Sequence, residues 1–214
     1  MRSIFLAGVG ISALLTGSAL ADVAAVATTD LNVRAGPGTE FQVIGVIGGG
    51  QPVAIQGCVE GAKWCSIGLE GGVGWVYSDY LAADISGQQV IVTERPAEFE
   101  VPAVTYDGPP AAVPGAVGGA IAGAVIAGPV GAVVGGVAGA AVGAAVDPPR
   151  EVQTYVTGHP VDPVYLEGEV VVGATLPDTV QIVEVPSYEY AYVYVNGVPV
   201  LVDPGSRKVV YIIR

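Results

Sequence analysis

Residues 31–38 constrain the fold of this 214-residue chain more than any other stretch. Leu31-Asn32-Val33-Arg34 alternates apolar and polar residues and runs directly into the turn Ala35-Gly36-Pro37-Gly38. Alternation is typical of a β-strand, and glycine and proline are typical of a tight turn. The stretch therefore predicts a small β-module.

The residues around this stretch, 22–84, continue the same pattern of short strands and turns, without apolar spacing of helical period. Glycine-rich stretches at 48–50, 61–62 and 70–72 separate the segments. The pattern predicts a five-stranded β-barrel, with strands at 26–33, 42–46, 52–56, 64–69 and 74–76.

The spacing of Asn32-Val33-Arg34-x-Gly36-Pro37, Gly57-Cys58, Trp64-Cys65 and Gly74-Trp75-Val76 resembles bacterial SH3-like (SH3b) domains. The resemblance implies a binding module with a shallow aromatic groove. The candidate groove residues are Phe41, Trp64, Trp75, Tyr77 and Tyr80, which could equally form the core of so small a barrel. Arg34 is a candidate either to clamp the turn or to pair with an acidic ligand.

Cys58 and Cys65 are the two cysteines of the chain, and they lie on either arm of a hairpin predicted to turn near Gly61. In an exported chain this placement predicts a disulfide, worth about 2.5 kcal/mol through closure of a short loop. The alternative is a reactive or metal-binding pair. A single histidine in the sequence and the lack of Cys-x-x-Cys spacing argue against it.

Residues 1–21 indicate export. Arg2 precedes an apolar run from Ile4 to Leu15, and Ala19-Leu20-Ala21 follows as a small-residue cleavage pattern. This is typical of a secretory signal peptide, whereas a membrane-spanning anchor needs about 20 apolar residues. We expect the protein in the periplasm or cell envelope.

Residues 85–114 combine prolines with acidic residues and predict a solvated linker. A short strand near 89–93, ending the barrel module, is the alternative.

Residues 115–146 contain only small and apolar residues and predict a glycine-zipper helical hairpin, interrupted at Gly128-Pro129. Such a hairpin would insert marginally into a membrane or self-associate, and the alternative is a flexible low-complexity segment. The predicted helix-packing positions are Gly115, Gly119, Gly123, Gly131, Gly135, Gly139 and Gly143.

Residues 150–214 predict a small antiparallel β-meander. Tyr188–Val195 alternates strictly, Asn196-Gly197 is a preferred two-residue turn, and Val198–Val202 returns before a last strand at 209–213. The pattern resembles a C-terminal domain of unknown function, type 1236, of alphaproteobacterial envelope proteins. Its four alternating tyrosines either pack against a neighbouring element or form a stacking platform.

The sequence predicts a mainly β, non-enzymatic protein without cofactor or metal. Twenty acidic residues against eight basic ones exclude nucleic acid as a partner. Neither a nucleophile–base pair nor a phosphate loop is evident, and His159 has no companion. We expect an envelope protein whose SH3-like module binds peptidoglycan or an envelope protein. The alternative is a structural, self-assembling protein without a dedicated ligand.

Overall fold

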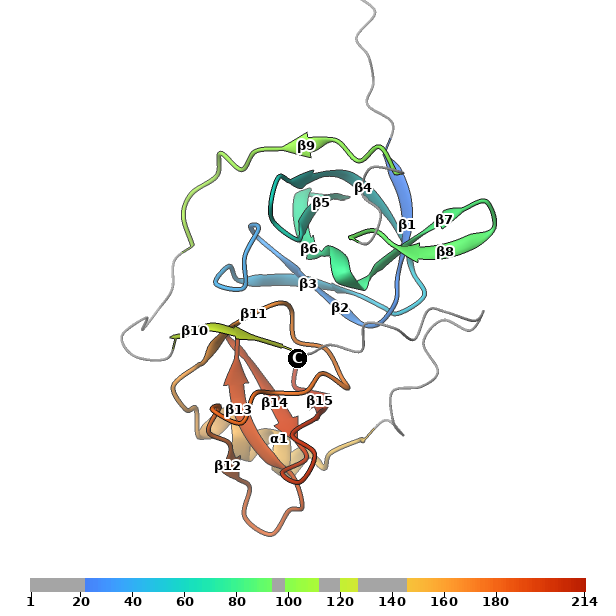
Figure 1. The fold of residues 1–214 in the computed structure, drawn as a ribbon. Helices are drawn as coiled ribbons and strands as arrows, with labels where there is room; N and C mark the ends of the chain where they lie inside the picture. Colours follow the sequence, from blue (N-terminus) through green and yellow to red (C-terminus); the bar gives the residue numbers. More distant parts are fainter. Residues whose placement is uncertain (1–21, 94–98, 112–119, 127–145) are drawn as a thin grey trace, which may run out of the picture.

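The computed structural model describes residues 22–93, 99–111, 120–126 and 146–214. The predicted signal peptide at 1–21 lies outside these residues. Figure 1 shows two β-rich bodies, an N-terminal module in blue and green and a C-terminal module in orange and red, with the C-terminus between them. No helix among the described residues is both long and apolar enough to cross a membrane.

The N-terminal module is a curled antiparallel sheet with the strand order β3-β2-β6-β5-β4-β1-β7-β8. The expected strand at 26–33 is two strands, because the bend at 28–30 sends β1 to pair with β4 and β7 while β2 pairs with β3 and β6. A hairpin of β7 and β8 also extends the sheet beyond the expected five strands. The bounds are β1 Val23–Ala27, β2 Leu31–Arg34, β3 Val43–Ile47, β4 Pro52–Val59, β5 Trp64–Leu69, β6 Gly72–Tyr77, β7 Leu81–Ile85 and β8 Gln88–Ile91, with a 3-10 turn at Ser78–Tyr80.

The described residues of the segment expected to be a solvated linker pack against this module instead, and the alternative, a strand near 89–93 that ends the barrel module, is confirmed by β8. Val90, Ile91 and Val92 are buried, and β9 (Ala103–Val104) pairs in parallel with the end of β4. The Cys58 amide donates to the Pro102 carbonyl over 2.8 Å. Phe99, Val101, Val104 and Tyr106, which lie among the prolines, are partly buried against the core. Composition alone does not predict this packing of 85–114.

The expected glycine-zipper hairpin is not shown. Residues 120–125 form the strand β10 (Ala120–Val125), which includes Gly123 and pairs in parallel with β11 (Tyr165–Glu167). The prediction of a helix is therefore wrong for residues 120–125. Glycine lowers helix stability, and β-branched residues favour strands. A neighbouring strand that can hydrogen-bond to the backbone of this segment therefore decides that it forms a strand and not a helix. The other six zipper glycines lie outside the described residues.

The C-terminal module confirms the predicted meander as the sheet β12-β13-β14-β15. Asn196 and Gly197 form the turn with φ of 53° and 77°, which two-residue hairpins of this type require. A helix, α1 (Arg150–Gly158), was not expected. Its Val152 and Val156 pack with Tyr192, whose hydroxyl donates to the His159 carbonyl over 2.8 Å. The strand bounds are β12 Val183–Glu184, β13 Ala191–Val195, β14 Val198–Val202 and β15 Val209–Ile212.

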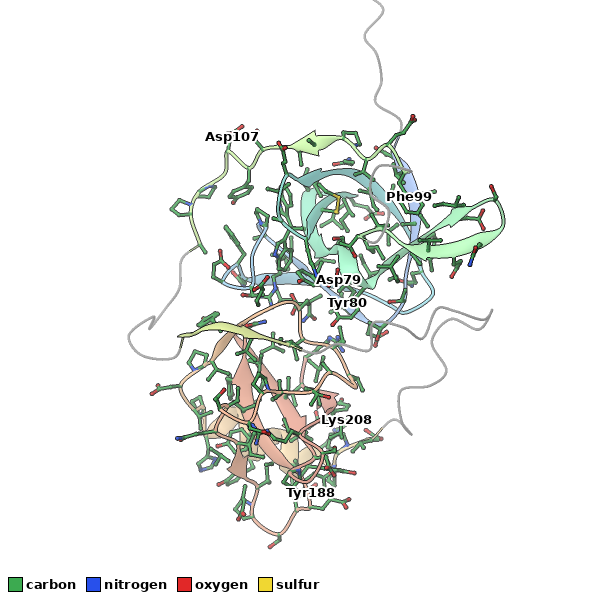
Figure 2. The ribbon with its side chains drawn as sticks, viewed as in Figure 1. Asp79, Tyr80, Phe99, Asp107, Tyr188 and Lys208 are labelled. Carbon is green, nitrogen blue, oxygen red and sulfur yellow. A yellow bond between two sulfur atoms is a disulfide. The ribbon has the colours of Figure 1, made fainter. Side chains whose placement is uncertain are left out.

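The two modules share one hydrophobic core. Val33 and Trp75 of the first module belong to the same buried cluster as Leu166 and Val193 of the second. Tyr80 lies where the modules meet (Figure 2), and its hydroxyl is 3.4 Å from the Glu169 carbonyl oxygen. The modules are therefore packed against each other across a buried interface.

Candidate functional site

Arg34 ends β2 and holds the turn that follows it. Its Nη1 donates to the carbonyls of Thr39, over 2.9 Å, and Phe41, over 2.6 Å. The predicted clamp is therefore present. The same guanidinium also meets an acidic group, since Nη2 donates to Glu169 Oε1 over 2.8 Å and Nε donates to Oε2. That acid belongs to the C-terminal module of the same chain, so the guanidinium is paired internally, and pairing with an acidic ligand stays a prediction.

Glu169 is fully buried at the interface, and Arg34 is 1% exposed. Besides the guanidinium, the carboxylate accepts hydrogen bonds from Asn32 Nδ2, over 3.1 Å, and from the Val170 amide, over 3.0 Å. A buried carboxylate requires such a set of donors to offset its loss of hydration. Sequence reasoning missed Glu169, because it is one of many acidic residues without a spacing signal.

Asn196 positions the segment that carries Glu169. Its Oδ1 accepts from the Leu166 amide over 2.8 Å, and its Nδ2 donates to the Gly168 carbonyl over 2.9 Å. Its carbonyl oxygen lies 3.2 Å from Arg34 Nη1. The predicted hairpin turn therefore also fixes the contact between the modules.

A cavity of about 500 Å³ lies beside this network, between β3 and the turn at Asn196. Asn32 is part of its wall and is 1% exposed. Asn32 Oδ1 accepts no hydrogen bond from any residue that the structure describes. The cavity is lined by Asn32, Arg34, Glu40, Phe41, Gln42, Val43, Gly45, Val46, Tyr165, Asn196, Gly197, Val198, Pro199, Ile213 and Arg214.

Comparison with known proteins identifies both modules. Residues 29–82 match the profile of the bacterial SH3 domain, and residues 155–214 match that of a domain of unknown function, DUF1236. The chain joins a bacterial SH3 domain to a DUF1236 domain. No curated protein matches the chain significantly. The cavity thus lies between the SH3 domain and the DUF1236 domain, with walls from both.

The five candidate groove aromatics of the SH3 domain do not form one surface. Trp64, Trp75, Tyr77 and Tyr80 are buried, at 4 to 7% exposed, whereas Phe41 is half-buried and lines the cavity. Burial raises the pKa of the Tyr77 and Tyr80 phenols above the usual value, and the charge of Asp79 adds to the effect. The core interpretation therefore holds for four of the five.

Two of these aromatic side chains are in contact with Tyr106, which lies in the segment after β9. Its ring makes edge-to-face contacts with Phe41, at a centroid distance of 5.3 Å, and with Trp75, at 5.6 Å. Its hydroxyl donates to the Pro109 carbonyl over 2.9 Å. This part of the chain therefore closes one side of the SH3 domain.

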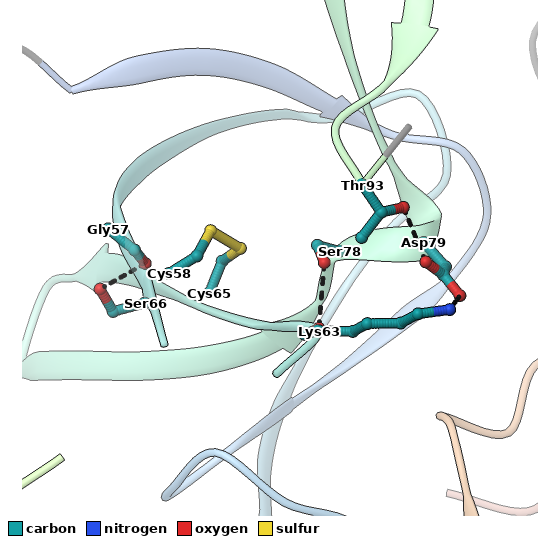
Figure 3. The surroundings of a disulfide bond; sticks show 8 residues. All are labelled: Gly57, Cys58, Lys63, Cys65, Ser66, Ser78, Asp79 and Thr93. Atoms are coloured by element: carbon teal, nitrogen blue, oxygen red, sulfur yellow. Dashed lines mark hydrogen bonds and ion pairs between the residues drawn. A yellow bond between two sulfur atoms is a disulfide. The ribbon is translucent and has the colours of Figure 1, made fainter. Parts of the chain in front are cut away.

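The predicted disulfide between Cys58 and Cys65 is confirmed, and it joins β4 to β5 at directly opposite positions (Figure 3). Lys63 and Asp79 form an exposed ion pair nearby, with Nζ 2.9 Å from Oδ2. The Thr93 hydroxyl donates to Asp79 over 2.7 Å. These contacts tie the strand ends of the SH3 domain together.

The described residues include no group of three or more metal-ligating side chains placed to hold a metal ion. His159 stacks on Tyr155, with ring centroids 4.2 Å apart, and its Nδ1 lies 2.8 Å from the Tyr155 carbonyl oxygen. His159 therefore lies at the C-terminal end of helix α1, where it contacts Tyr155, and it is not among the residues that line the cavity.

Proposed function

We propose that the protein is a non-enzymatic binding protein of the bacterial cell envelope, in which the SH3 and DUF1236 domains together bind cell-wall peptide. One observation carries the proposal, namely the cavity bounded by β3 of the SH3 domain and by the Asn196–Pro199 segment of the DUF1236 domain. Pockets of several hundred Å³ with mostly apolar walls and few fixed polar groups are typical ligand sites.

Rigid placement of the cavity walls supports this function. Arg34 holds the turn that carries Phe41, and Asn196 holds the segment that carries Glu169. Because the Arg34–Glu169 pair joins the two domains, the walls are held in place by buried hydrogen bonds on both sides. A preorganised site loses less conformational entropy when it binds.

Charge narrows the class of ligand. Residues 22–84 contain seven acidic residues against two basic ones, Arg34 and Lys63. Such a surface repels strongly anionic polymers and favours neutral or amine-bearing ones. A wall peptide or a neutral glycan fits this requirement better than an anionic wall polymer.

Export to the envelope is part of the proposal. The sequence of residues 1–21 has the features of a signal peptide. The Cys58–Cys65 disulfide supports an oxidising compartment, since such bonds are rare where thiols are kept reduced.

Self-assembly is the second candidate function. Strand β3 is an edge of the described sheet, and edge strands pair readily with other chains. Ile44 and Val46 on this strand are exposed, as are Leu69 and Val73. Exposed apolar side chains of this kind favour association between copies, and sedimentation of the mature chain over a concentration series measures it.

The test of wall binding uses the mature chain, residues 22–214, in a pull-down on isolated peptidoglycan. Val46→Trp fills the cavity from a side chain that is 42% exposed, and Val73→Trp makes the same change at a position that is 50% exposed and outside the cavity wall. We expect retention of the wild type and of Val73→Trp, with loss of Val46→Trp. Equal retention of all three proteins would place wall binding elsewhere, and no retention of any would favour a protein partner or self-assembly.

A further inference from the structure

We propose that the SH3 domain carries a peptide-binding groove along the end of β4, and that its partner is the segment 101–106 of a second copy of the chain. In the single chain the same groove holds the chain's own segment. The inference gives self-assembly, the second candidate function, a defined contact, and it rests on that function. Of the groove residues, Phe41 also lines the cavity between the domains.

The groove begins at an edge that β1 leaves open. Strand β4 pairs with β1 as far as Ile55, whereas Cys58 and Val59 pair in parallel with β9 (Figure 1). The Cys58 amide donates to the Pro102 carbonyl over 2.8 Å. A short extended segment is therefore added to the sheet at an edge that β1 does not reach, and this is a common mode of peptide recognition.

Two sites beside this edge receive side chains of the segment. Gly57 forms a notch, because the position of a Cβ there lies 2.3 Å from Val104 Cγ1. Phe41 and Trp75 form an aromatic site, and the Tyr106 ring makes edge-to-face contacts with both, at centroid distances of 5.3 and 5.6 Å. Contacts of this geometry add to the free energy gained by burial alone.

The segment lies in the groove as an extended peptide ligand would. The side chains of Val104 and Tyr106 are partly buried, whereas those of Ala103 and Thr105 are exposed. Such alternation directs every second side chain toward the receptor. The residues at positions 104 and 106 therefore determine which segments fit.

A second copy of the chain can supply the same segment. Strand β9 contains only two residues, Ala103 and Val104, and so short a pairing opens locally at a low free energy. Residues 101–106 carry no charge, and neither do the groove residues, so two copies meet here without bringing like charges together, although each has a net charge of −12. Because every copy carries both groove and segment, exchange of the segment joins one copy to another.

The test mixes two variants of the mature chain, residues 22–214, each of which lacks one half of the contact. Tyr106→Ala weakens the segment and leaves the groove intact, whereas Gly57→Ala fills the notch and should free the segment. We expect the unlabelled Gly57→Ala chain to shift the Cys58 amide and Trp75 indole NMR signals of the ¹⁵N-labelled Tyr106→Ala chain saturably.

Two unlabelled chains serve as controls. Gly71→Ala keeps its segment in its own groove, because a Cβ there meets no other atom within 4 Å. It should bind the labelled chain about 10-fold or more weakly, since the apparent affinity falls with the fraction of free segments. The double variant Gly57→Ala with Tyr106→Ala frees a segment that lacks the aromatic ring, and it should also bind about 10-fold or more weakly. A synthetic peptide of residues 101–109 replaces the Gly57→Ala chain if that variant does not fold.

Two results would overturn the inference. One is the lack of a saturable shift with the Gly57→Ala chain or the peptide, and the other is an equal response to the Gly71→Ala chain. If the wild type still associates in sedimentation, self-assembly through another surface stands and only the groove fails. Retention on peptidoglycan is measured separately, so the wall-binding function does not depend on either result.

Discussion

Glu169 and Arg34 are a buried pair of opposite charges whose separation in sequence is 135 residues. We predict that Glu169→Gln lowers the free energy of unfolding by about 3 kcal/mol or more, because it leaves a guanidinium buried without its counter-ion. Urea unfolding followed by tryptophan fluorescence measures the change.

The control for this variant is Lys63→Met at the ion pair with Asp79. Lys63 is 52% exposed, and exposed pairs contribute about 1 kcal/mol or less. Equal losses in the two variants would show that the Arg34–Glu169 pair is no more important for stability than a surface pair.

Tyr80 should make the free energy of unfolding depend on pH under alkaline conditions. Burial, with the charge of Asp79, raises the pKa of its phenol in the folded state, so the folded protein holds this proton more tightly than the unfolded chain. The resulting stability is complete below the ordinary tyrosine pKa of about 10 and is lost as the pH rises above it. We predict that the urea midpoint falls above about pH 10, and that it falls less steeply in Tyr80→Phe. Identical pH profiles would contradict this role of Tyr80.

At the scale of elements, β9 depends on a glycine in the strand it pairs with. A Cβ on Gly57 would lie 2.3 Å from Val104 Cγ1 and 2.9 Å from the Pro102 carbonyl oxygen. We therefore expect Gly57→Ala to release β9 from β4. Amide hydrogen exchange at Cys58, whose N–H donates to Pro102, should become at least about 10-fold faster as this hydrogen bond opens.

Gly71→Ala is the matched control, because a Cβ there meets no other atom within 4 Å. It should leave exchange at Cys58 unchanged. If Gly57→Ala also leaves it unchanged, β9 does not protect this amide.

The disulfide stabilises the β4–β5 pair by restricting the conformations that the unfolded chain can adopt. Its two cysteines are seven positions apart, so loop closure predicts that Cys58→Ser with Cys65→Ser lowers the free energy of unfolding by about 2.5 kcal/mol. Mass spectrometry of the wild type without reductant should show no free thiol. A double variant as stable as the wild type would contradict the stabilising role.

At the scale of the whole molecule, the shared core predicts cooperative unfolding of the two domains. Both tryptophans, Trp64 and Trp75, belong to the SH3 domain, so fluorescence follows the unfolding of that domain and of the core that it shares. Hydrogen exchange of β13 and β14 reports on the DUF1236 domain. We expect the same urea midpoint from both measurements, and two separate midpoints would show that the interface does not couple the domains.

The sequence determined those features of the fold that depend on neighbouring residues. The β-strands, the Asn196-Gly197 turn and the Cys58–Cys65 pair follow from side-chain alternation, turn chemistry and a short hairpin. The same local patterns carried the resemblance to the two families that residues 29–82 and 155–214 match.

Only the tertiary structure decided which distant groups meet. It placed Glu169 against Arg34, Tyr106 over Phe41, and β10 beside β11 as a strand. Intrinsic preferences differ by about 1 kcal/mol or less per residue, so a glycine-rich segment takes the conformation that its neighbours can pair with. A buried charge likewise requires a counter-ion, but alternation and spacing do not say which of twenty acidic residues folding will bring to it.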